Sequence, residues 1–598
     1  MPDFTSTDPR PTLNLDIEAT AHVHEILPVV VRRWRIAVHS VRALLRQREE
    51  QVFLALALVI GALTGLVVVA FIVVTEHLGM RLYPPGSAAW RRVSFPFAGS
   101  LLIGYLLYRY FPYARGSGVP QTKAALYARG GRITLRTVLG KFLCTSATLA
   151  SGIPLGREGP SVQVGSGIAS VLGRNLGLSQ ERVKALIPVG ASAAIAAAFN
   201  TPMAAVVFAL EEIVGDLNAP VLGSVVLASV TAWGVLRALL GNNPLFRVPQ
   251  YELVHPVEFL VYAALGVAGG LVSAAFTKLL LRMRAWFLRL PKKTAWIQPV
   301  AGGLGVGLLG WMVPQVLGVG YGYVGEALNG KMAVELMLVL VFLKVISVTT
   351  SYASGNAGGI FGPALFIGAM LGGSLGTIAH HWLPRYTANS GAYALVGMGT
   401  AFAGIVRAPM TSVLMIFEMT RDYAVIVPLM ISNMISLFIG SRLAPVPTYE
   451  ALAIQDGIHL PSAEARSRLA LRQIARVMRP PRQLLSGALT VRQALETSRS
   501  SELRTYIVVD DRGVIGVLNR EILEQEFASK PDEAIRKVVP VLNFPHVHSD
   551  QTLDEALDRM GSNHLDMLPV VSRGNVHQLE GTVSVGDVLN SYGLGTEP

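Results

Sequence analysis

The stretch GREGP (residues 156–160) places a carboxylate between glycines inside a long apolar region. A charged side chain at that depth of a bilayer costs roughly 3 kcal/mol on insertion scales, so such an acid indicates function. Residues 151–168 (SGIPLGREGPSVQVGSGI) also align without gaps on residues 354–371 (SGNAGGIFGPALFIGAML), at an offset of 203 positions (354 minus 151). The second copy keeps both glycines and the proline of GREGP but has Phe361 in place of Glu158. The two copies therefore share a backbone pattern and differ in the side chain that could carry chemistry.

A second pair of segments extends this repeat. Residues 190–213 align on residues 397–420 at an offset of 207 positions (397 minus 190), so the membrane region is duplicated. Glu211 recurs in the second copy, which favours a structural role such as capping or pairing. The neighbouring Glu212 is replaced there by Met419. An acid without a counterpart is the better candidate for proton handling, and the alternative is a helix end that reaches water.

Composition identifies a protein that crosses the membrane several times. Of its 598 residues, 51% are hydrophobic and only 15% are charged, and the mean hydropathy is +0.46. The N-terminus lacks the pattern of a cleaved signal peptide. The single cysteine, Cys144, excludes an internal disulfide and cysteine-based zinc sites. We expect no metal site.

The net charge of +12 comes largely from arginines beside the apolar spans. This is the positive-inside pattern, so we expect both termini in the cytoplasm and no nucleic-acid partner. The arginines precede the first span, at about 52–75, or follow the last: Arg32, Arg33, Arg35, Arg42, Arg46 and Arg48, then Arg466, Arg468, Arg472, Arg476, Arg479 and Arg482.

Several later apolar runs are short and interrupted by glycine or proline, which is typical of transporters with a binding site at the bilayer midplane. The N-terminus of such a helix binds anions through unpaired N–H groups. An ionised Glu158 can occupy that anion position and leave it on protonation. The alternative is a buried structural acid paired with Arg157. Lys344, which also lies in an apolar run, is interpreted as a segment end or a member of a pair.

Three further segments offer donors to an anion. GSGVP (116–120) combines a hydroxyl with flanking glycines, and GGIFGP (358–363) supplies backbone donors without an acid. For GGIFGP, a glycine-rich contact between helices is an equal alternative to anion binding. Tyr449 follows two prolines, and its phenol either donates to an anion or belongs to an interfacial aromatic belt.

The chain changes character after residue 443. From about 477 it predicts a soluble α/β region with strands at 506–509 and 567–571. Helices predicted at Val491–Ser498 and Leu553–Met560 repeat at an offset of 62 positions (552 minus 490). The tail therefore contains two small tandem modules.

GSGVP, GREGP and GGIFGP, in this order, resemble the three anion-binding motifs of the CLC chloride channel and transporter family. The resemblance covers roughly residues 50–450, and the tail resembles the paired CBS domains of many members. It implies a homodimer of polytopic α-helical subunits, each with its own pore and an internal inverted repeat. Two positions depart from the family pattern: Pro154 precedes GREGP, and Gly362 replaces a common alanine.

The resemblance also implies roles for individual residues. Ser117 and Tyr449 would bind chloride through their hydroxyls, and Ile360 and Phe361 through backbone N–H groups. Glu158 would be the external gating glutamate. Glu212 falls where proton-coupled members keep an internal glutamate and passive channels generally have an apolar residue.

In the tail, the family pattern for an adenine nucleotide is matched by Ser584 and Asp587, for phosphate and ribose respectively. The first module has Asn519 and Ile522 at those positions and lacks the acid. The alternative is a purely structural CBS pair that stabilises the dimer.

We therefore predict a chloride/proton antiporter and not an enzyme, in the cell membrane, with chloride, protons and lipid as partners and no required cofactor. The rival on the same scaffold is a passive voltage- or proton-gated chloride channel. A rival of another class is an adenine-nucleotide sensor with a membrane anchor. The expected domains are a cytoplasmic segment (1–50), a CLC-type transmembrane domain (51–450), a linker (451–476) and tandem CBS domains (477–598).

Overall fold

The computed structural model describes residues 49–591 apart from 85, 218–220, 242–245, 247–250, 252, 459–472, 483, 499–503 and 540–543. The predicted N-terminal segment and most of the predicted linker lie outside the described residues. Two compact units form, one over Phe53–Ala465 and one that contains Arg466–Pro598.

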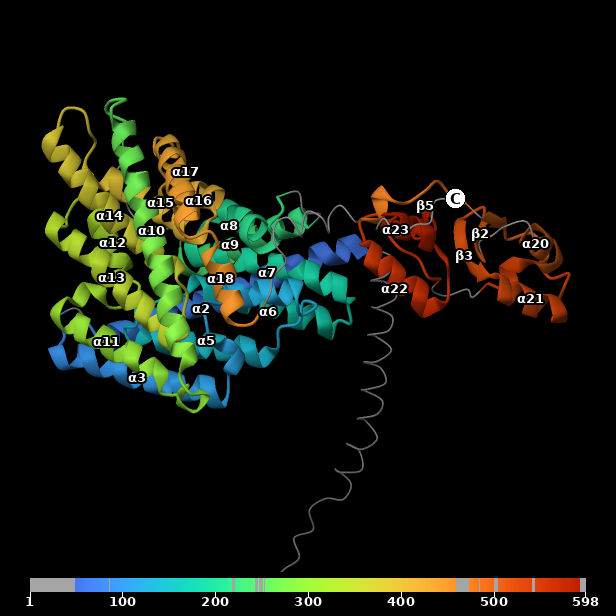
Figure 1. Cartoon of the computed structure of the whole chain (residues 1–598), viewed down its shortest axis with the longest axis horizontal. Coiled ribbons are helices and arrows are strands. Elements are labelled where there is room, and N and C mark those ends of the chain that lie inside the picture. Colours follow the sequence, from blue (N-terminus) through green and yellow to red (C-terminus); the bar gives the residue numbers. More distant parts are fainter. Residues whose placement is uncertain are drawn as a thin grey trace, which may run out of the picture. The chain divides into compact units, whose positions relative to one another are not determined.

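The membrane unit is an all-helical bundle (Figure 1). Its helices are α2 (Glu49–Leu82), α3 (Ala89–Arg109), α4 (Val119–Tyr127), α5 (Leu135–Ala150), α6 (Glu158–Asn175), α7 (Gln180–Phe199), α8 (Pro202–Phe208), α9 (Leu222–Leu240), α10 (Glu258–Arg289), α11 (Gln298–Met312), α12 (Tyr321–Leu328), α13 (Val334–Ser354), α14 (Phe361–Trp382), α15 (Ser390–Val406), α16 (Pro409–Thr420), α17 (Ile426–Leu443) and α18 (Thr448–Gln455).

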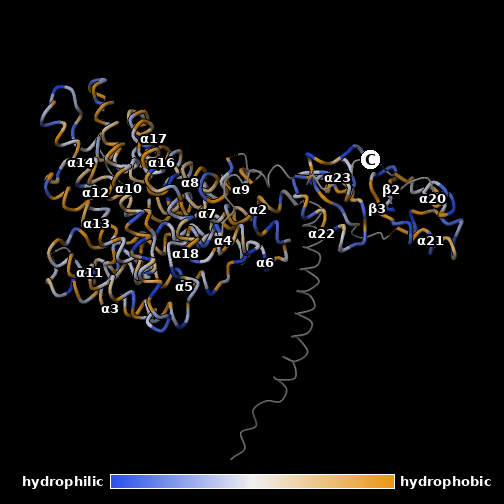
Figure 2. The backbone as a smooth tube through the Cα atoms, in the orientation of Figure 1, coloured by the Kyte–Doolittle hydropathy of each residue, from blue (hydrophilic) through white to orange (hydrophobic). Residues whose placement is uncertain are grey.

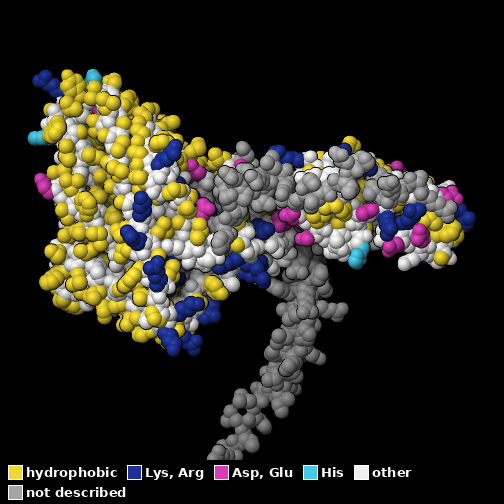
Figure 3. All heavy atoms as spheres, in the orientation of Figure 1, with side chains coloured by type: hydrophobic (Ala, Val, Ile, Leu, Met, Phe, Trp, Pro, Cys, Tyr) yellow, Lys and Arg dark blue, Asp and Glu magenta, His cyan; other side chains and the backbone are white. Residues whose placement is uncertain are grey.

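Seven spans in the described part of the chain are long and apolar enough to cross a membrane: α2, α7, α9, α10, α13, α14 and the segment Ile426–Gln455. Hydrophobic residues run through these helices (Figure 2), and hydrophobic side chains cover much of the visible outer face (Figure 3). Large apolar side chains of these helices, such as Leu260 of α10 and Phe342 of α13, are exposed. This is the surface that a lipid-embedded bundle presents, and the chain is an integral membrane protein.

Glycines allow the same close helix contact in both repeats. A Cβ atom at Gly165 would collide with the carbonyl oxygen of Gly190, where α6 crosses α7, and Gly368 and Gly397 repeat the contact between α14 and α15. In the absence of a hydrophobic drive between helices in lipid, small residues stabilise such crossings by close packing.

Polar contacts between the halves are reciprocal. Glu211 accepts hydrogen bonds from the Thr411 and Met410 amides at the start of α16, at 2.9 and 3.2 Å. Glu418 accepts from the Ala204 and Met203 amides at the start of α8, at 2.7 and 3.0 Å. The structural role predicted for Glu211 from its recurrence is confirmed: each acid caps a helix of the opposite half.

The tail contains two α/β modules. The first has a three-stranded sheet in the order β1-β2-β3, with β1 parallel and β3 antiparallel to β2, and the second has the antiparallel pair β4-β5. The elements are β1 (Leu484–Ser486), α20 (Val491–Ser498), β2 (Thr505–Asp510), β3 (Gly513–Asn519), α21 (Arg520–Ser529), α22 (Leu553–Asn563), β4 (Met567–Val571), β5 (Leu579–Ser584) and α23 (Val585–Ser591). The predicted strands and helices are confirmed, with shifts of at most a few residues.

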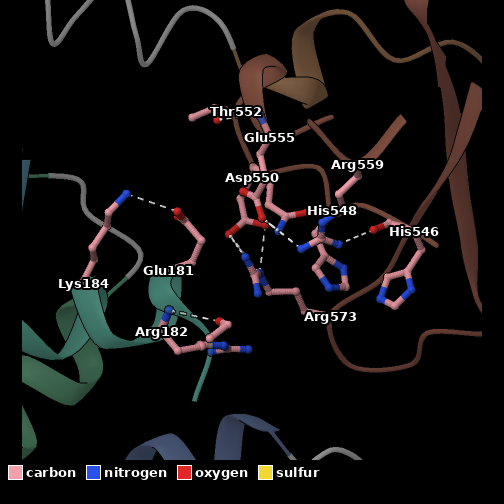
Figure 4. A network of polar contacts seen from close by, with 12 residues as sticks. Glu181, Arg182, Lys184, His546, His548, Asp550, Thr552, Glu555, Arg559 and Arg573 are labelled. Carbon is pink, nitrogen blue, oxygen red and sulfur yellow. Dashed lines mark hydrogen bonds and ion pairs between the residues drawn. The ribbon is translucent and has the colours of Figure 1, made fainter. Parts of the chain in front are cut away.

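Contacts between the modules hold the tail together. Asp566 accepts a hydrogen bond from the Arg504 amide at 2.8 Å, and its own amide donates to the Thr505 hydroxyl at 3.1 Å. In the second module, Arg573 binds Asp550 at 2.8 Å and Arg559 binds Glu555 at 2.9 Å (Figure 4).

Candidate functional site

The two repeated glycine motifs meet in the buried interior of the membrane unit. Gly156 and Gly359 exchange two backbone hydrogen bonds of 2.7 Å, which form an antiparallel bridge. Two residues further along each motif a helix begins, α6 at Glu158 and α14 at Phe361. The bridge therefore brings two helix N-termini together, and each has backbone N–H groups without an intrahelical acceptor.

Glu158 is fully buried, and its carboxylate is held by donors from the second half of the chain. Oε2 accepts from the backbone N–H of Gly362, in the first turn of α14, at 3.2 Å. Oε1 accepts from the Tyr321 hydroxyl at 2.5 Å. Arg157, the alternative partner, forms its ion pair with Glu76 at 3.1 Å. The carboxylate thus lies at the position that an anion bound to the α14 N-terminus would take.

Ser117 lies against the start of α6. Gly116 and Gly118 adopt φ values of +89° and +105°, which favour glycine, and a Cβ atom at Gly159 would lie 2.9 Å from the Ser117 hydroxyl. The Ser117 amide donates to the Tyr352 hydroxyl at 3.1 Å. The GSGVP and GREGP segments, which are separate in sequence, are therefore neighbours in the fold.

Two buried hydroxyls of this region have no hydrogen-bond partner within 3.5 Å among the described residues. They belong to Ser117, with no exposed surface, and Tyr449, which is 1% exposed. The side chains of Ser117 and Tyr449 lie close enough to interact, and the charges of Glu212 and Glu158 act on Tyr449. Because buried polar groups are nearly always satisfied, two orphan hydroxyls side by side fit a bound anion that accepts from both.

Phe361 takes the place of Glu158 in the second copy, and its side chain packs against other aromatic rings. Its ring contacts those of Phe402, Phe199 and Phe208, with centroids 4.3, 4.9 and 5.6 Å away. The resemblance assigns only the backbone N–H groups of Ile360 and Phe361 to chloride, and that assignment stays a prediction. The sequence did not indicate that Gly362 supplies the donor to Glu158.

Glu212 lies in a π-helix, Ala209–Val214, and binds Lys123 of α4 at 2.8 Å. Both side chains are only 10% exposed. π-Helical turns occur frequently at functional sites. Sequence reasoning missed Lys123. Lys123 is the only charged residue of α4, and this lone charge was the available signal for an acidic partner.

Two fully buried lysines hold equivalent loops. Lys141 donates to the carbonyls of Ala114 and Gly116, and Lys344 donates to those of Val316 and Gly318, at distances between 2.5 and 3.1 Å. Lys344 is therefore in mid-helix and bonded to backbone, where the sequence suggested a segment end or an ion pair.

The loop held by Lys344 is the counterpart of GSGVP in the second half of the chain. Gly318 and Gly320 are left-handed, as Gly116 and Gly118 are. The recurring glycine spacing was the signal for this counterpart in the sequence. In the second half the loop leads to Tyr321, at the start of α12.

In the tail, Ser584 and Asp587 form a capping box at the start of α23. The Ser584 hydroxyl donates to the Asp587 carboxylate at 2.7 Å, and the Asp587 amide donates back at 3.2 Å. Arg479 and Arg482 also bind this carboxylate, at 3.0 and 2.8 Å. In the first module Asn519 caps α21 alone, through a bond from the Ile522 amide.

Comparisons with known proteins agree with this architecture. The family model described as voltage gated chloride channel matches residues 99–441, and that of the CBS domain matches residues 535–593. An H(+)/Cl(-) exchange transporter ClcA of Salmonella arizonae is 32% identical over 71% of this chain and 92% of that protein. A putative chloride channel protein, ClcB-like, of Ralstonia nicotianae is 34% identical over 63% of this chain and 89% of that protein.

Among solved structures, a slow cyanobacterial Cl-/H+ antiporter superposes with a TM-score of 0.62 at 26% identity, covering 68% of this chain and 97% of that one. The family model covers more than half of the sequence, and the helix arrangement agrees with it. The chain belongs to the CLC family of chloride channels and transporters.

Proposed function

We propose that this protein is a chloride/proton antiporter. The observation that supports it best is the Glu158 carboxylate bonded to the α14 amide of Gly362, beside the orphan hydroxyls of Ser117 and Tyr449. A carboxylate that occupies an anion position must leave before the anion passes. It leaves most easily when protonated, so the proton and chloride movements are linked through one site.

Glu212 supplies the second proton position in this proposal. Its asymmetry in the repeat, its burial and its contact with Lys123 fit a group that exchanges protons with the cytoplasmic side. A passive channel has no need of an acid there, and the relatives named as H(+)/Cl(-) exchangers favour the coupled mechanism over the channel.

The test is a flux measurement on the full chain in liposomes. A chloride gradient is expected to drive protons uphill. Glu158→Ala and Glu212→Gln are both expected to abolish proton movement. Chloride still flows in both, but its rate changes in Glu158→Ala, because no carboxylate then occupies the anion position. Glu181→Gln, at an exposed acid, is the matched control. Chloride flux without proton movement in the unmodified protein would show a passive channel, and chloride flux unaffected by Glu158→Ala would favour the nucleotide-sensor reading.

The tail is proposed to bind an adenine nucleotide at Ser584 and Asp587. Arg479 and Arg482, whose side chains are 58% and 43% exposed, are placed to meet the phosphates. The Asp587 carboxylate already has four partners, so ribose binding requires at least one arginine to turn away. Titration of the full chain with ATP is expected to raise its thermal stability, and Asp587→Asn is expected to abolish this shift. No shift with ATP, ADP or AMP would leave the purely structural CBS pair.

The assembly follows the family pattern in this proposal: a homodimer in lipid, with a pore in each subunit and both termini in the cytoplasm. Cross-linking in liposomes tests the dimer. Protease access to the tail in sealed vesicles of known orientation tests the topology, and cleavage from the extracellular side would contradict it.

A further inference from the structure

Tyr321 reaches the gating carboxylate from a loop that is anchored on both sides. Lys344 binds the carbonyls of Val316 and Gly318 just before it, and α12 begins at Tyr321 itself. The rings of Phe246 and Tyr321 pack in a T-shaped arrangement, with centroids 5.7 Å apart. The hydroxyl is therefore held where it donates to Glu158 Oε1 at 2.5 Å. A donor placed by packing loses little entropy when it forms the bond.

Gly362 makes room for this hydroxyl. A Cβ atom at position 362 would lie 2.9 Å from the Tyr321 oxygen, 3.0 Å from a Val319 methyl and 3.2 Å from Glu158 Oε2. The first of these separations is shorter than real Cβ contacts. Alanine, which is common at this position in the family motif, would push the phenol or the carboxylate away. The hydrogen bond from Tyr321 to Glu158 therefore depends on glycine at position 362.

Other charged and titratable groups lie near the Tyr321–Glu158 hydrogen bond, but their side chains donate no hydrogen bond to Glu158 in the described part of the chain. The Arg157 guanidinium lies 5.8 Å from the centre of the Tyr321 ring and is paired with Glu76 of α2. Tyr449 interacts with Glu158 electrostatically. The short hydrogen bond from Tyr321 is the only side-chain donor to Glu158 in the described part of the chain.

We propose that Tyr321, with the space left by Gly362, is a latch that holds the ionised Glu158 on the α14 amide. Tyr321 is a positioning residue: it acts on chloride through Glu158, and the inference rests on the proposed gating role of that acid. Chloride and the carboxylate compete for the same backbone donors. A second hydrogen bond to the carboxylate therefore weakens chloride binding and slows the release of the gate.

The first experiment measures chloride binding to the purified full chain by calorimetry. Hydrogen bonds to charged groups are strong enough to change an equilibrium by ~tenfold. Tyr321→Phe is therefore expected to tighten chloride binding by several-fold, up to ~tenfold, and to raise the chloride turnover in liposomes. Tyr323→Phe, which removes a phenol two positions along the same helix, is the control and is expected to leave both unchanged.

Two further variants separate the latch from a structural effect. Gly362→Ala is expected to tighten chloride binding in the same direction, and the double variant with Tyr321→Phe is expected to add little, because both changes remove the same bond. In a Glu158→Ala background Tyr321→Phe is expected to give no tightening, since no carboxylate competes.

The outcomes distinguish the latch from the gate. Unchanged chloride affinity in Tyr321→Phe, or equal tightening with and without Glu158, would overturn the latch while Glu158→Ala still uncouples protons. Coupled transport that survives Glu158→Ala would instead overturn the gating role on which the latch rests.

Discussion

The ion pair between Lys123 and Glu212 permits a quantitative test of the internal site. Its atoms are 2.8 Å apart and both side chains are 10% exposed. Removing one partner of a buried pair destabilises a protein by up to about 3–5 kcal/mol, because the other charge is left in a poorly solvated place. Lys123→Met keeps the length of the side chain and removes its charge, so it tests this contribution directly.

A matched pair lies on the surface of the same unit. Lys184 and Glu181 are 3.2 Å apart, with side chains 32% and 50% exposed (Figure 4). Exposed pairs contribute about 0–1 kcal/mol. Lys184→Met is therefore expected to lower the free energy of unfolding by at most about 1 kcal/mol. Lys123→Met is expected to lower it by up to about 3–5 kcal/mol.

The assay combines stability with coupling. Reversible unfolding in mixed micelles measures the two single variants and the double variant Lys123→Met/Glu212→Met, which is expected to recover much of the loss because an apolar pair replaces the ion pair. In liposomes, Lys123→Met is expected to reduce proton movement more than chloride movement, because a buried carboxylate without its cation tends to be neutral. Equal stability of Lys123→Met and Lys184→Met, with normal proton coupling in both, would refute the reasoning.

Three further predictions concern packing, loop anchoring and the tail. Gly397→Ala is expected to disrupt the α14–α15 crossing, since its methyl would collide with the Gly368 carbonyl. The control, Gly234→Ala on α9, places its methyl in open space and is expected to be neutral. The monodispersity of each variant in detergent measures both effects. Lys141→Met leaves two buried carbonyls without donors, at about 1–3 kcal/mol each, and is expected to weaken chloride binding measured by calorimetry, because the loop that it holds loosens. Asp587→Ala removes a helix cap and is expected to lower the stability of the tail by about 1 kcal/mol or more, which limited proteolysis would detect as faster cleavage.

Local patterns in the sequence determined the architecture of this protein. Its composition indicated a membrane bundle, and two gapless repeats indicated the duplication. The recurrence of Glu211 as Glu418 predicted a structural role, and the structure confirms it with reciprocal caps. The strands and helices of the tail were also predictable, because alternation and helical periodicity depend on neighbouring residues.

Contacts between distant segments were decided only by the tertiary structure. Lys123 and Glu212, like Tyr321 and Glu158, are far apart in the sequence, and their pairing depends on how the helices cross. The tail shows the same limit of sequence reasoning. Asp587 matches a nucleotide-binding pattern in the sequence, whereas in the fold it caps a helix and is bound by two arginines. The acids that could serve a proton path were visible in the sequence because burying a charge is costly wherever it occurs. The donors that hold each acid were not, since any part of the chain can supply them once it is folded.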